Sequence, residues 1–112
     1  MSSLWIGQAE RAAWQRRAAA ELAAILEAHG GLPLISWTVG PAGSVLAGRI
    51  SGLAPAPQVR EVFAAWRTEL ALGEEREDQM SGGMSWLHAA ARRHDVTVRL
   101  AAAVFEYEDG DL

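Results

Sequence analysis

The sequence contains no cysteine, and this absence excludes disulfides, thiolate metal sites, iron–sulfur ligation and cysteine nucleophiles. Lysine and asparagine are also absent, so arginine supplies every basic side chain apart from histidine, while alanine is abundant. We attribute this bias to the codon usage of a high-GC bacterial genome. No apolar run approaches the roughly 18 residues that a membrane-spanning helix needs. We therefore expect no membrane association.

Recognisable catalytic and cofactor motifs are absent as well. His88 and His94 are six positions apart, a spacing that matches no standard zinc site. The glycine-containing stretches lack the Walker and dinucleotide patterns, and "GGMSW" lacks the flanking pattern of a nucleophile elbow. We therefore expect no metal, no cofactor and no catalytic residue, and favour a non-enzymatic role.

The composition is that of one globular domain. The 112 residues are 50 % hydrophobic and 21 % charged, and a chain of this length holds one hydrophobic core, so residues 1–112 form a single predicted domain. The start "MSSLWIGQAERAAWQRR" lacks the features of a secretory signal, which predicts a cytoplasmic protein. The net charge of −4 disfavours general nucleic-acid binding, because such proteins neutralise phosphates with a basic excess.

Two segments have helical periodicity. Residues 8–29 are rich in helix formers, with apolar side chains at helical spacing, and Gly30, Gly31 and Pro33 then stop the helix. Residues 57–72 repeat Val59, Val62, Phe63, Trp66 and Leu70 along one stripe, and Pro57 lies in the first turn. Both segments are predicted to bury one face.

The stretch "LPLISWTVGPAGSVLAGRISG" predicts a β-hairpin around residues 40–43. With these four residues as the loop, Val39 faces Ser44 and Trp37 faces Leu46. One face then carries the apolar side chains, and Arg49 lies on the other. Gly48 is expected beside Trp37, where the missing side chain leaves room for the indole.

Three segments are expected to be loosely held. Residues 1–7 and 108–112 are predicted to fray at the termini. Residues 73–83, which include "EEREDQMSGG", are charged and have no apolar period, so a flexible loop is expected there.

The stretch "SGGMSWLHAAARRHD" fits either a helix or a strand. Alanine and arginine favour a helix over 85–94, which gives three helices and a three-stranded sheet. A strand over about 84–93 instead pairs with the alternating final segment "DVTVRLAAAVFEYE". The apolar side chains of the two strands then share one face of the sheet, and the remaining side chains share the other. We prefer the strand, which predicts an α+β fold in the order α-β-β-α-β-β. Its four-stranded, mostly antiparallel sheet carries both helices on one face.

This fold leaves the other sheet face open, and that face is where we expect function. Its candidate interaction residues are Trp86, His88, Arg92, Arg99, Arg49, Phe105 and Tyr107. Aromatic and arginine side chains are enriched at protein interfaces, so we expect a homodimer or an adaptor that binds another protein. One alternative is a single-stranded nucleic-acid platform, with aromatic side chains stacking on bases and arginines contacting phosphates. A second is a small-molecule-binding regulatory domain.

Overall fold

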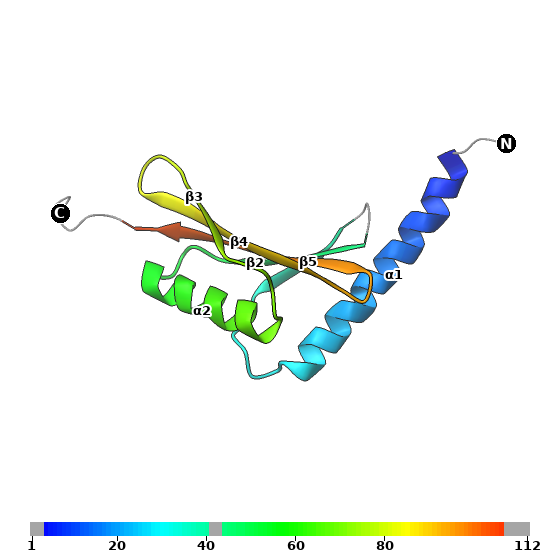
Figure 1. Cartoon of the computed structure of the whole chain (residues 1–112), viewed down its shortest axis with the longest axis horizontal. Helices are drawn as coiled ribbons and strands as arrows, with labels where there is room; N and C mark the ends of the chain where they lie inside the picture. Colours follow the sequence, from blue (N-terminus) through cyan, green and yellow to red (C-terminus); the bar gives the residue numbers. More distant parts are fainter. Residues whose placement is uncertain (1–3, 41–43, 107–112) are drawn as a thin grey trace.

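The computed structural model describes residues 4–40 and 44–106. Over these ranges the chain forms two helices and one five-stranded mixed sheet, an α+β architecture (Figure 1). The elements are α1 (Leu4–Ala28), β1 (Ser36–Val39), β2 (Val45–Ile50), α2 (Ala56–Glu69), β3 (Arg76–Gln79), β4 (Met84–Arg93) and β5 (Val96–Phe105).

The strands lie in the order β1-β2-β5-β4-β3. All neighbouring pairs are antiparallel except β2 and β5, which run parallel because the connection between them passes through α2 and the β3–β4 hairpin. The α+β class and the two helices are confirmed. The predicted four-stranded sheet is wrong by one strand, since β3 adds a fifth.

The additional strand comes from the segment expected to be a flexible loop. Residues Arg76–Gln79 pair antiparallel with Ser85–His88 of β4, and Met80 donates its backbone N–H to the carbonyl of Met84 at 2.8 Å. All four residues of β3 are exposed. The sequence "REDQ" has no apolar alternation because this short edge strand buries neither face, so backbone pairing alone defines it.

The ambiguous stretch is a strand, as preferred. Residues Met84–Arg93 form β4 and pair with all ten residues of β5, so the helical alternative is wrong. His94 and Asp95 make the connecting turn with φ angles of 50° and 66°. Asp and His enter this left-handed region more readily than most residues, which permits a tight turn without glycine. The buried carboxylate of Glu21 on α1 also accepts a hydrogen bond from Arg93 and contacts His94.

The first hairpin keeps its predicted faces but differs in register. Val39 pairs with Leu46 and Trp37 pairs with Gly48, two residues from the predicted alignment. A shift of two residues leaves every side chain on the same face of a strand, so the apolar face is preserved. The predicted proximity of Gly48 and Trp37 is confirmed. Residues 41–43 of the predicted loop lie outside the described residues.

Both helices differ in extent from the prediction. Helix α1 begins at Leu4, four residues before the predicted start, so residues 4–7, which were expected to fray, are helical. Its N-terminal half extends past the sheet (Figure 1). Helix α2 begins one residue before Pro57 and ends at Glu69. Neither helix in the described part of the chain combines the length and apolarity that crossing a bilayer requires.

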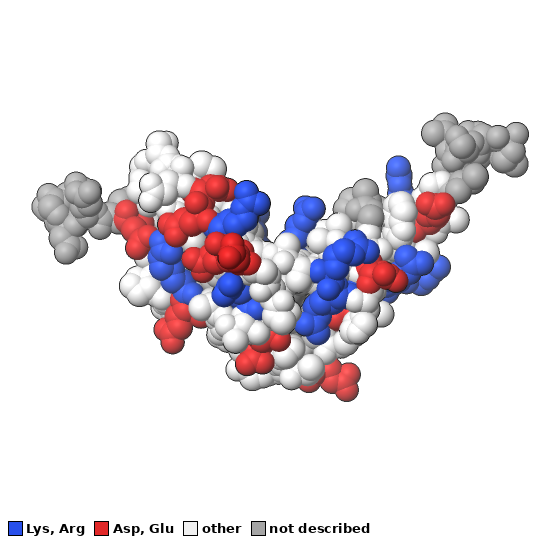
Figure 2. Space-filling view, viewed as in Figure 1, with Lys and Arg blue, Asp and Glu red and all other residues white. Residues whose placement is uncertain are grey.

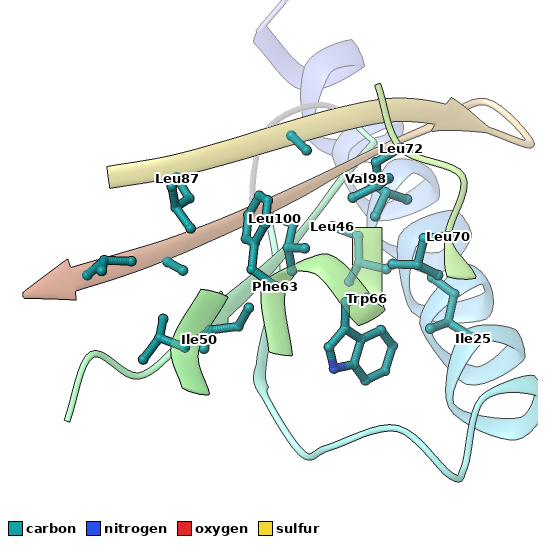
Figure 3. Close-up of a cluster of buried hydrophobic side chains, with 14 of the residues drawn as sticks. Ile25, Leu46, Ile50, Phe63, Trp66, Leu70, Leu72, Leu87, Val98 and Leu100 are labelled. Carbon is teal, nitrogen blue, oxygen red and sulfur yellow. The ribbon is translucent and has the colours of Figure 1, made fainter. Parts of the chain in front are cut away.

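The hydrophobic core lies between the helices and one face of the sheet. Phe63 and Trp66 of α2 pack against Leu46 of β2 and Leu100 of β5, and Ile25 of α1 joins the same cluster (Figure 3). Trp66 donates its indole N–H to the Pro33 carbonyl at 2.8 Å. Because the core occupies one face of the sheet, the polar and small side chains of the alternate positions lie on the other.

Candidate interaction surface

The strand register assembles most of the predicted interaction residues on the face opposite the core. Arg49 of β2 lies beside Ala101 of β5, and Ala101 lies beside His88 of β4. Trp86 lies beside Ala103 in the next row of the same face. We define the open face by the larger side chains on these alternate positions: Arg49, Arg76, Asp78, Met84, Trp86, His88, Arg92, Arg99 and Phe105.

An aromatic and cationic cluster lies near the middle of the open face. The rings of Trp86 and His88, two positions apart on β4, stack with centroids 6.3 Å apart and an interplanar angle of 29°. The guanidinium carbon of Arg49 lies 5.1 Å from the Trp86 ring centroid. The stacked aromatic rings attract each other. The guanidinium over the indole face is attracted by the ring quadrupole.

A shallow depression surrounds this cluster. Two adjoining parts of it, each about 650 Å³, share Ala47, Gly48, Asp78, His88 and Ala101. Its floor is made of glycine and alanine, and longer side chains form its sides. Figure 2 shows the molecule hollowed between the end that carries β3 and the end that carries α1, with arginine side chains on both sides of the hollow and acidic side chains beside them on the β3 side. Small floor residues allow another chain to approach the sheet closely.

The arginines of the open face form no ion pairs with carboxylates among the described residues. Within residues 4–40 and 44–106, no carboxylate lies within 4.0 Å of Arg49, Arg76, Arg92 or Arg99. Arg92 instead donates to the hydroxyl of Thr97 at 3.1 Å. Apart from Asp78 and Glu74, which line the depression, the side chains of the open face among the described residues are cationic or neutral, although the whole chain has a net charge of −4. Positive charge is therefore concentrated on this face.

The arginines on the helix-covered side are arranged differently. Arg60 of α2 donates to Glu77 at 3.1 and 3.0 Å and also to Glu106, while Arg93 donates to Glu21. The hydrogen bonds from Arg60 hold the pKa of Glu77 below its usual value and raise the pKa of the guanidinium. The pairs of Arg60 join α2 to the sheet side, and the pair of Arg93 joins β4 to α1, which indicates a structural role.

Met84 and two charged residues of the open face were missed by the sequence analysis. Arg76 and Asp78 of β3 lie beside His88 and Trp86 respectively, and an oxygen of Asp78 is 3.3 Å from Nε2 of His88. They were missed because their segment was predicted to be a loop. A two-residue spacing of charged side chains before the "SGG" turn was the only available indication of an edge strand.

Phe105, another predicted site residue, is the last residue of β5. Phe105 lies beside Met84 on the open face and is 39 % exposed, which leaves its ring available to a partner. Tyr107 lies outside the described residues.

Comparison with known proteins gives no relative from which to assign a function. No family model, no curated protein and no solved structure matches this chain.

Proposed function

We propose that the chain is a non-enzymatic interaction protein of the cytoplasm whose open face binds an acidic segment of another protein. The observation that carries this proposal is the concentration around Trp86 of arginines that form no ion pair among the described residues, on a chain of net negative charge. Complementary charge guides a partner to such a face and fixes its orientation.

The composition of the open face also supports a protein partner. Tryptophan and arginine contribute large shares of the binding energy at interfaces. Here Trp86 and Arg49 adjoin a depression of about 650 Å³ with an alanine and glycine floor. A partner main chain lying on this floor would place its acidic side chains beside Arg49 and Arg99. The apolar parts of the partner would contact Trp86 and Phe105.

Charge also favours an acidic protein segment over a second copy of the chain or a nucleic acid as the partner. A homodimer joined sheet to sheet would bring the arginines of two copies together, and juxtaposed like charges disfavour association. The homodimer stays a prediction, which native mass from light scattering tests at two protein concentrations. For nucleic acid, the net charge of −4 opposes binding outside the local basic face.

The proposal is tested with a fluorescein-labelled peptide in which glutamate and leucine alternate. Its anisotropy should rise on titration with the protein, and the binding should weaken with added salt because the charges are exposed. Arg99→Glu should reduce binding at least about tenfold, since it both removes an attraction and adds a repulsion. Arg99 is exposed, so the variant should unfold at nearly the parent temperature.

The matched control is Arg11→Glu, which makes the same charge change on the exposed surface of α1. It should leave binding nearly unchanged, because Arg11 is outside the open face. Equal losses from Arg11→Glu and Arg99→Glu would refute a specific surface, as would the absence of peptide binding to the parent protein. Tighter binding of labelled oligothymidylate than of the peptide would indicate that the partner is a nucleic acid and not a protein.

A further inference from the structure

Asp78 and Glu74 are the acidic residues that line the depression, and of the two only Asp78 forms an ion pair among the described residues. Its carboxylate lies 3.3 Å from Nε2 of His88 and borders both parts of the depression. The side chain is 62 % exposed, so water reaches it and burial does not fix its position. A carboxylate of the protein itself thus already lies beside His88 on the open face.

The position of Asp78 in the sheet explains why this carboxylate is replaceable. Strand β3 has four residues, all exposed, and is the edge of the sheet. Asp78 pairs across the strands with Trp86, while Arg76 pairs with His88. The contact between Asp78 and His88 is therefore a diagonal one between exposed side chains, and such contacts contribute little to folding stability.

We propose that His88, which lies beside Arg76 on the neighbouring strand, forms a carboxylate-binding subsite, and that Asp78 occupies it in the free protein until a partner's glutamate or aspartate displaces it. This inference rests on the proposed function, because it specifies which chemical group of the acidic partner enters the depression. Asp78 is then an internal competitor that lowers affinity for acidic partners.

The local geometry favours a carboxylate of a peptide as the displacing group. The imidazole Nε2 faces an oxygen at the end of a short side chain, and Trp86 lies across from that side chain on the neighbouring strand. On one face of a partner strand, side chains recur at every second residue, and an aspartate there would have the same length as Asp78. Acidic residues on such a strand can therefore reach His88 and Arg49 in turn.

The test compares Asp78→Asn with the parent protein, using the same glutamate–leucine peptide. Removing the competing charge should tighten binding about two- to fivefold, the range that exposed charge pairs support. Asp78→Glu keeps a carboxylate at this position and should bind nearly as the parent does. The matched control is Glu61→Gln on α2, an exposed acidic residue on the helix-covered side of the sheet.

The outcomes separate this inference from the proposed function. Unchanged or weaker peptide binding by Asp78→Asn, with binding still lost in Arg99→Glu, would refute the subsite and leave the acidic partner in place. Equal tightening in Glu61→Gln would show a general charge effect and would also refute the subsite. A gain seen with oligothymidylate but not with the peptide would overturn the assignment to a carboxylate. Failure of the parent protein to bind the peptide would refute the proposed function itself.

Discussion

Arg49 of β2 reaches over the ring of Trp86 on β4, although β5 lies between their strands. The contact is possible because the intervening positions of β5 on this face are Ala101 and Ala103, whose side chains are too short to separate the two residues. The small residues of β5 thus create both the depression and the aromatic–cation pair that borders it.

This pair should have a measurable but small energy of interaction. A double-mutant cycle with Arg49→Ala and Trp86→Ala is expected to give a coupling energy of about 0.5–1 kcal/mol from urea unfolding, the range for exposed cation–π pairs. A parallel cycle with Arg92→Ala and Trp86→Ala should give a value near zero, since Arg92 donates to Thr97 instead. Equal coupling in both cycles would contradict a specific contact.

Replacing Gly48 should destabilise the fold through Trp37. A Cβ atom at position 48 would lie 2.9 Å from Cζ3 of Trp37 and 3.1 Å from Cδ1 of Ile35, so both side chains would have to move. We expect Gly48→Ala to cost about 1–3 kcal/mol of unfolding free energy, as overpacking does. Measurement by urea unfolding at one temperature tests this.

Gly7 provides the matched control for this substitution. An added Cβ there meets no atom within 4 Å, and the residue is in α1, where alanine is the better helix former. Gly7→Ala should therefore leave stability unchanged or raise it. Equal destabilisation by the two substitutions would show that the crowding around Trp37 is not the cause.

The second helix should depend strongly on Trp66. This side chain is 2 % exposed, packs edge to face against Trp37 with centroids 5.6 Å apart, and donates to the Pro33 carbonyl. Trp66→Ala is expected to lower the unfolding free energy by about 3–5 kcal/mol, the usual cost of large aromatic truncations in cores. Leu34→Ala is the control, because Leu34 is 98 % exposed and should be nearly neutral. If Trp66→Ala unfolded at the same urea midpoint as the parent, the assignment of Trp66 to the core would be wrong.

The fold was predictable where burial leaves a periodic pattern. The apolar stripe of α2 and the alternation of β5 identified their elements, and the two faces of 84–93 matched those of its partner strand. Strand β3 could not be found this way, because all of its residues are exposed and its pairing uses the backbone. The two-residue shift in the register of the first hairpin could not be predicted from the pattern either, since it leaves every residue on its predicted face.

The candidate site was predictable as a set of residues but not as an arrangement. Alternation placed Trp86, His88 and Arg99 on one side of their strands. The approach of Arg49 to Trp86 depends on the strand order β2-β5-β4, which side-chain periodicity does not encode. The contact of Asp78 with His88 depends on β3, so its role could only follow from the three-dimensional structure.

The ion pairs on the helix-covered side should make stability depend on pH. The hydrogen bond from Arg60 holds the pKa of Glu77 below its usual 4.5, so ionised Glu77 stabilises the folded state above that value. This contribution is lost as the pH falls through the lowered folded-state pKa, because the carboxylate then becomes protonated in both states.

Glu77→Gln should therefore be less stable than the parent near pH 7, and the difference should shrink as urea unfolding is repeated at successively lower pH. Glu75→Gln removes a nearby exposed acid without an ion pair among the described residues, so its difference from the parent should be small throughout. A Glu77→Gln deficit that persisted unchanged into strong acid would mean that the side chain contributes by packing, since protonation would then leave its contribution intact. A deficit that grew on acidification would reverse the expected sign and contradict the lowered pKa.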